Sequence, residues 1–101
     1  MSNPERAGPE VLVRLYDVIE TRKRTHPKES RTARLFEAGL PKIAQKVGEE
    51  ATEVVVASLA QDDRALVGES ADLLYHLLVL LAARGIHPDA VFAELAARAR
   101  E

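Results

Sequence analysis

The placement of the five prolines constrains the fold of this chain more than any other feature of its sequence. They lie at positions 4, 9, 27, 41 and 88, so they separate long segments rich in Ala, Leu, Val, Glu and Arg without interrupting them. These residue types favour helices, whereas a proline inside a helix removes a hydrogen bond and clashes with the preceding turn. The sequence therefore predicts an all-α protein, a bundle of about five helices.

Proline, glycine and capping residues mark the ends of these helices. Pro27 ends the first helix, Gly39 stops a short second one, and Pro41 is placed as the first residue of the third. We expect Asp62 to cap the fourth helix and Gly85 to terminate it. The expected helices are Glu10–Arg24, Thr32–Ala38, Pro41–Ala60, residues 63–84 and Pro88–Ala99.

Size and composition exclude several classes of function. A chain of 101 residues forms one domain, residues 1–101, and buries only about two thirds of its unfolded surface, so association with a second copy would stabilise it. The formal charge of -2 argues against nucleic acid as a partner, because nucleic-acid-binding proteins normally carry excess positive charge. The absence of cysteine excludes disulfides, thiolate zinc sites and thiol catalysis, and it indicates a reducing compartment such as the cytoplasm.

No segment of the sequence predicts export or membrane insertion. The N-terminus, MSNPERAGPE, is polar and lacks the apolar core of a signal peptide. The longest apolar stretch, from Leu73 to Ala83, is interrupted by His76 and is shorter than the roughly 20 residues that a membrane span needs. We therefore expect a cytoplasmic protein that binds no membrane.

Five acidic residues gather on the two longest expected helices. On the third helix, helical spacing places three acids and two lysines on one flank, beside an apolar stripe. On the fourth, Glu69, Asp72 and His76 lie within about 60° of one another, in a helix that is otherwise apolar nearly all round and is expected to be buried on all sides. The charged residues of the third helix are Lys42, Lys46, Glu49, Glu50 and Glu53.

Electrostatic repulsion indicates what this cluster needs. Two carboxylates about 6 Å apart repel by roughly 3 kcal/mol at an effective dielectric near 20, so four ionised acids would cost about 15 kcal/mol, which is comparable with the whole stability of a small domain. Either several acids are protonated or the cluster holds a cation. Oxygen ligands suit Mg²⁺ or Mn²⁺, and Mg²⁺ is often shared with substrate phosphates. Lys42 and Lys46 fit such an anion, because the positive end of their helix disfavours them otherwise.

Other interpretations remain open at this stage. The flank of the third helix is also consistent with a solvated charged face, His76 with a core histidine and Tyr75 with packing. Six cationic residues between positions 22 and 34 form a basic connector that either is solvated or binds phosphate. A di-iron bundle would need Glu-x-x-His pairs, which this spacing lacks, and a non-catalytic dimerisation module leaves Glu69 and Asp72 unexplained.

The same residues carry a family resemblance. The segments KVGEEATEVVVAS and ESADLLYHLLVLLAARG resemble the phosphoribosyl-ATP pyrophosphohydrolases of histidine biosynthesis, which are MazG-like all-α nucleotide pyrophosphohydrolases. The resemblance covers nearly the whole chain and has two departures: Arg31, in ESRTARL, replaces a common aromatic residue, and Pro41, in GLPKI, replaces a small polar one. The resemblance implies hydrolysis of 1-(5-phosphoribosyl)-ATP to phosphoribosyl-AMP and pyrophosphate, with Mg²⁺, or alternatively Mn²⁺, as cofactor.

The resemblance also assigns roles to individual residues. Matching of the ExxE and ExxD motifs implies that four acids bind the metal: Glu50, Glu53, Glu69 and Asp72. Helical spacing alone leaves open whether Glu49 or Glu50 faces the metal; motif matching selects Glu50, and Glu49 is then expected to orient or deprotonate the attacking water. The residues expected to bind substrate phosphates are Lys42, Lys46, Arg31 and Arg34.

We also expect an obligate homodimer. A second face of the fourth helix, through Val67, Leu74, Leu78 and Leu81, is apolar, and the other helices of so short a chain can hardly cover it. The dimer is expected to be built mainly on the two long helices. Without cysteine or room for a second domain, the protein is expected to act only on the triphosphate and not on the phosphoribosyl-AMP product.

Overall fold

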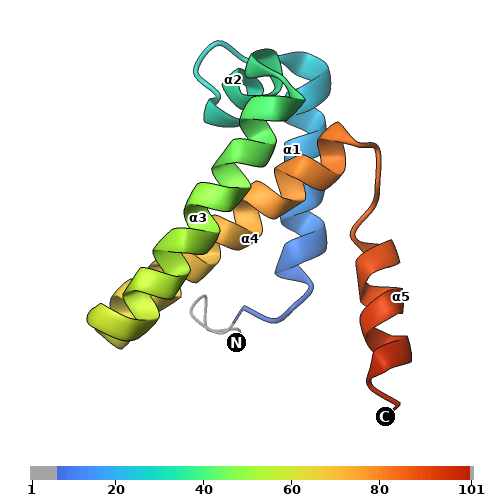
Figure 1. Ribbon diagram of the computed structural model, residues 1–101. Helices are drawn as coiled ribbons and strands as arrows, with labels where there is room; N and C mark the ends of the chain where they lie inside the picture. Colours follow the sequence, from blue (N-terminus) through green and yellow to red (C-terminus); the bar gives the residue numbers. More distant parts are fainter. Residues whose placement is uncertain (1–6, 101) are drawn as a thin grey trace, which may run out of the picture.

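The computed structural model describes residues 7–100, which form five helices and no strand (Figure 1). The prediction of an all-α protein is confirmed, and each observed helix boundary lies within one or two residues of the expected one. Residues 1–6, which carry part of the expectation about a signal peptide, lie outside the described residues. The helices are α1 (Val11–Thr25), α2 (Arg31–Ala38), α3 (Leu40–Ala60), α4 (Asp63–Ala83) and α5 (Asp89–Arg98).

Local capping interactions fix three of these boundaries. The side chain of Asp62 accepts a hydrogen bond from the backbone N–H of Ala65 at 2.9 Å, so the predicted cap of α4 is confirmed. Ser30 caps α2 in the same way, through Ala33 at 3.0 Å. At the other end of α4, Gly85 adopts a φ of 69°, a left-handed conformation that glycine reaches without strain.

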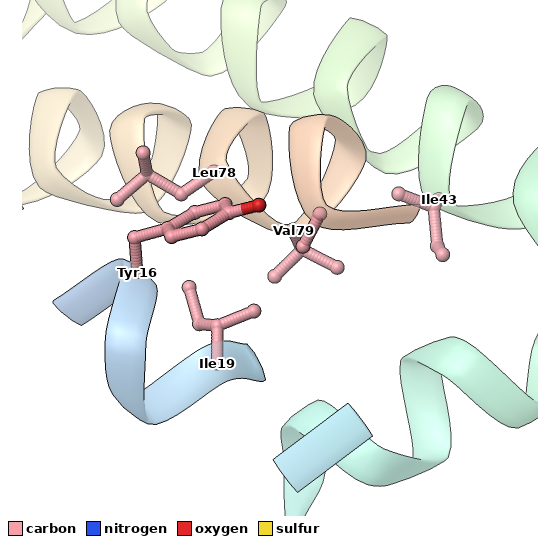
Figure 2. Close-up of a cluster of buried hydrophobic side chains, with 6 residues drawn as sticks. Tyr16, Ile19, Ile43, Leu78 and Val79 are labelled. Atoms are coloured by element: carbon pink, nitrogen blue, oxygen red, sulfur yellow. The ribbon is translucent and has the colours of Figure 1, made fainter. Parts of the chain in front are cut away.

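The two long helices pair as an antiparallel hairpin, and α1 and α2 cover only part of it. In Figure 1, α1 crosses the C-terminal half of α4, while α2 lies at the top of the molecule between α1 and α3. Tyr16 and Ile19 of α1 project toward Val79 of α4 (Figure 2). The buried core thus joins three helices and contains Tyr16, Ile19, Ile43, Leu78, Val79 and Ala82.

Within one chain, α4 is not buried on all sides, contrary to expectation. Its buried residues all lie in its C-terminal half, under α1: His76, Leu78, Val79 and Ala82. Of the apolar face expected to be uncovered, Val67 is 69% exposed and Leu74, near the middle of the helix, is 46% exposed, whereas Leu78 is buried. By length and composition alone, α4 is apolar enough to cross a membrane, although the shorter Leu73–Ala83 stretch predicts no membrane span. The core helix of a soluble protein meets the same criterion.

The helix α5 stands apart from the bundle. The segment before it is fixed, because Pro88 is buried and the ring of His87 contacts the ring of Tyr16 edge-on with centroids 4.9 Å apart. Among the described residues, α5 itself packs against no other helix, and a groove of about 440 Å³ lies between it and Leu81 of α4. Its apolar side chains, such as Leu95, therefore remain largely exposed.

The core tyrosine gives a first testable prediction. Burial, assisted by the hydrogen bond of 2.9 Å that the Tyr16 hydroxyl donates to Glu20, raises the pKa of Tyr16 to about 12. In a Tyr75→Phe variant, where Tyr16 is the sole tyrosine, phenolate absorbance should appear near pH 12 rather than near the ordinary value of about 10. Since the pKa is raised in the folded state, this group's contribution to stability is complete below about pH 10 and is lost as the pH rises toward 12. Ionisation near pH 10 with helical circular dichroism intact would contradict the prediction.

Candidate metal and phosphate site

Three carboxylates converge between α3 and α4. Glu50 of α3 and Glu69 and Asp72 of α4 each offer one oxygen, and these oxygens all lie within 4.8 Å of one another. We call these three residues the acid triad. Glu69 and Asp72 share a face of α4 because they are three residues apart, and the antiparallel pairing brings Glu50 opposite them.

The acid triad carries uncompensated negative charge. Partial burial raises the pKa of Glu69 above its ordinary value, and the charges of Glu53, Asp72 and Glu50 raise it further. Glu53 is exposed and its carboxylate is not part of the acid triad, yet among the neighbouring charges it raises the pKa of Glu69 the most. The arrangement therefore favours either a bound proton or a bound cation.

Glu49 points to a different environment from its neighbour Glu50. Its carboxylate accepts a hydrogen bond of 2.8 Å from the side-chain amide of Gln45 and lies 3.5 Å from the ammonium group of Lys46. These contacts lower the pKa of Glu49, and the hydrogen bond from Gln45 has the largest effect. The two residues that helical spacing could not separate are thus separated by structure: Glu50 joins the acid triad, and Glu49 lies outside it on an exposed surface.

In the described part of the chain, none of the four expected phosphate-binding cations forms an ion pair with the acid triad. Lys46 pairs with Glu49, as the solvated-face interpretation anticipated for these two residues. Lys42 lies exposed one turn earlier on α3, and Arg34 is exposed on α2. The guanidinium carbon of Arg31, also on α2, lies 5.5 Å from the centroid of the Tyr75 ring.

His76 lies in the core rather than in the acid triad. It is 1% exposed, and its Nδ1 lies 2.8 Å from the backbone oxygen of Asp72. A carbonyl oxygen only accepts hydrogen bonds, so Nδ1 is the donor in this contact. Nε2 is buried and has no hydrogen-bond partner among the described residues, which makes His76 a core histidine satisfied at one nitrogen.

Sequence analysis missed one polar contact beside these acids. The hydroxyl groups of Tyr75 in α4 and Thr32 in α2 lie 2.6 Å apart and form a hydrogen bond. The sequence pattern predicts only packing for Tyr75, and the one signal of a further contact is its position three residues after Asp72. This contact connects α2 directly to the helix that carries two members of the acid triad.

A helical hairpin with carboxylates converging from both helices defines an all-α protein with an oxygen-only site suited to a hard divalent cation. The chain belongs to the phosphoribosyl-ATP pyrophosphohydrolase family, whose model matches residues 12–99. This confirms the resemblance found in the sequence.

Individual relatives are similar over most of the chain. A phosphoribosyl-ATP pyrophosphatase of Paramagnetospirillum magneticum is 59% identical over 88 residues, which cover 87% of this chain and 81% of the relative. The protein of the same name from Erythrobacter litoralis is 57% identical, covering 83% of this chain and 81% of the relative. That of Pelotomaculum thermopropionicum is 54% identical, covering 88% of this chain and 91% of the relative.

Proposed function

We propose that the protein hydrolyses 1-(5-phosphoribosyl)-ATP to phosphoribosyl-AMP and pyrophosphate, the second step of histidine biosynthesis, in the cytoplasm. Membership of the family and the names of relatives at 53–59% identity support this activity. The structural observation that carries the proposal is the acid triad, because three carboxylates within 4.8 Å are a natural site for the cation that a triphosphate brings.

The acid triad fits Mg²⁺ or Mn²⁺. Its donors are all carboxylate oxygens, and the raised pKa of Glu69 indicates negative charge that a cation would neutralise. Glu50, Glu69 and Asp72 would hold the ion, with Glu53 as the fourth acid at its edge. When bound, the ion supplies neutralisation of the charge that develops on the departing pyrophosphate.

Residues around the acid triad position the substrate and water. Lys42, Arg31 and Arg34 present exposed cationic groups to the phosphates, and Lys46 does so from its pair with Glu49. Glu49 is proposed to orient the attacking water. Its lowered pKa keeps it ionised, so it accepts a hydrogen bond from water more readily than it removes a proton.

We further propose that two copies form a homodimer. The chain exposes 7298 Å², whereas a compact monomer of 11.1 kDa exposes about 5,700 Å². Its radius of gyration of 14.9 Å likewise exceeds the roughly 13 Å of a compact domain of this length. This excess includes the exposed apolar residues of α3 and α4, and a standard interface buries about 800 Å² per partner.

The activity is tested by incubating the protein with phosphoribosyl-ATP and Mg²⁺. We expect phosphoribosyl-AMP and pyrophosphate in equal amounts, no turnover after chelation of the metal, and no further reaction of the product on adding Zn²⁺. ATP should be a much poorer substrate, because it lacks the phosphoribosyl group. Equal rates with both substrates would instead indicate a general nucleotide pyrophosphohydrolase.

Calorimetric titration of Mg²⁺, with and without nucleotide, separates this proposal from a non-catalytic dimerisation module. An enzyme of the proposed kind should bind the metal, and bind it more tightly when nucleotide is present. A dimerisation module should bind neither the metal nor the nucleotide.

A further inference from the structure

Tyr75 makes contacts that packing alone would not require. Its side chain projects from α4 toward the first turn of α2, where its hydroxyl group bonds to the hydroxyl group of Thr32 at 2.6 Å. The face of its ring lies under the guanidinium group of Arg31, whose central carbon is 5.5 Å from the ring centroid. One aromatic side chain therefore holds two consecutive residues of α2.

These contacts restrict a side chain that would otherwise be free. Arg31 is exposed, and a long exposed arginine samples many rotamers unless a neighbour holds it. The cation–π contact of the guanidinium group with the aromatic face limits that freedom and leaves its N–H groups available to an anion. The hydrogen bond between Tyr75 and Thr32 keeps the backbone from which Arg31 extends in a fixed position relative to α4.

Tyr75 connects this arginine to the turn of α4 that follows the acid triad. Tyr75 follows Asp72 by three residues, so the two side chains lie one helical turn apart and about 60° apart around α4. A nucleotide whose triphosphate is bound at the acid triad would extend other groups past this turn. Arg31 carries the planar donor fork that suits a phosphate group.

We propose that Tyr75 is a positioning residue that orients Arg31 toward the phosphate of the substrate's phosphoribosyl group, and so favours phosphoribosyl-ATP over ATP. This inference rests on the proposed function.

The test compares Tyr75→Phe, Tyr75→Leu and Thr32→Val by steady-state kinetics with phosphoribosyl-ATP and with ATP. Tyr75→Phe keeps the ring but loses the hydrogen bond, so KM for phosphoribosyl-ATP should rise about two- to fivefold with kcat within twofold. Thr32→Val removes the same bond and should have the same effect, and the double variant should be no worse than either single one. Tyr75→Leu also loses the cation–π contact and should raise KM about tenfold. KM for ATP should not change.

A matched control is available in the other tyrosine. Tyr16→Phe also deletes a tyrosine hydroxyl, which here bonds to Glu20 on α1, and should leave KM for both substrates unchanged. In an Arg31→Leu background, Tyr75→Leu should raise KM no further, because the group that it positions is absent. Circular dichroism verifies that each variant is folded.

Calorimetric binding of phosphoribosyl-AMP and AMP separates this inference from the proposed activity, since binding needs no turnover. The wild type should bind phosphoribosyl-AMP more tightly, and Tyr75→Leu should reduce that preference about tenfold. An unchanged preference in folded Tyr75→Leu, or equal losses for both ligands, would overturn the positioning role. A wild type that hydrolyses phosphoribosyl-ATP without binding phosphoribosyl-AMP preferentially would overturn it too and leave the activity standing. Preferential binding without hydrolysis would overturn only the activity.

Discussion

Replacement of Asp72 by asparagine is expected to lower the rate of pyrophosphate release by at least about 100-fold. The substitution keeps the size of the side chain but removes one of the three negative charges within 4.8 Å of one another. The amide oxygen is a weaker ligand for a hard cation than a carboxylate oxygen. Glu50→Gln should act in the same way from α3. Release of pyrophosphate and affinity for Mg²⁺ are the quantities to measure.

The metal-free Asp72→Asn protein should be at least as stable as the wild type. The charge of Asp72 helps raise the pKa of Glu69, so its removal relieves repulsion within the acid triad. The pKa of Glu69 is raised above 4.5 in the folded state. The stability that protonated Glu69 contributes is therefore present at low pH and is lost as the pH rises through this folded-state pKa. Chemical denaturation at a series of pH values should show a smaller pH-dependent loss of unfolding free energy for the variant than for the wild type.

Asp17→Asn is the matched control for this experiment. Asp17 is exposed on α1 and is not part of the acid triad, so it should tolerate the same chemical change without loss of turnover. Full activity in both Asp72→Asn and Glu50→Gln would show that the acid triad is not the metal site. A marked loss of metal-free stability would favour a structural ion pair instead.

Val67→Asp is expected to dissociate the homodimer. Val67 belongs to a set of exposed apolar residues on α3 and α4 that we call the hairpin patch, namely Val55, Val56, Leu59, Val67 and Leu74. If this patch is the interface, an unpaired charge in it should raise the dissociation constant by at least about 100-fold. The monomer should keep its helicity, because Val67 is 69% exposed within one chain. Light scattering at micromolar concentration measures the change in mass.

A charge placed elsewhere on the apolar surface provides the control. Leu95, on α5, is 58% exposed and lines the groove beside α4. If the interface is built mainly on the two long helices, Leu95→Asp should leave the dimer intact. Dissociation by Leu95→Asp alone would move the interface to α5, and a wild type that is monomeric at micromolar concentration would contradict the homodimer altogether.

The sequence alone determined the features that depend on neighbouring residues. The ends of the helices follow from local signals such as the Asp62 cap and the left-handed Gly85, and these interactions span only a few residues. The shared face of Glu69 and Asp72 follows equally from their spacing, because the helical period fixes the angle between side chains of one helix. Fold class and the acids of α4 were therefore predictable.

Only the tertiary structure decided how one helix is turned toward another. Glu49 and Glu50 differ by 100° around α3, and the choice between them depends on the rotation of α3 against α4, which is set by distant core contacts such as those of Ile43. The contact of Tyr75 with Thr32, 43 residues apart, is likewise absent from any local pattern. The tertiary structure also decided which part of α4 is buried, because helical periodicity describes a single helix and cannot specify where α1 crosses it.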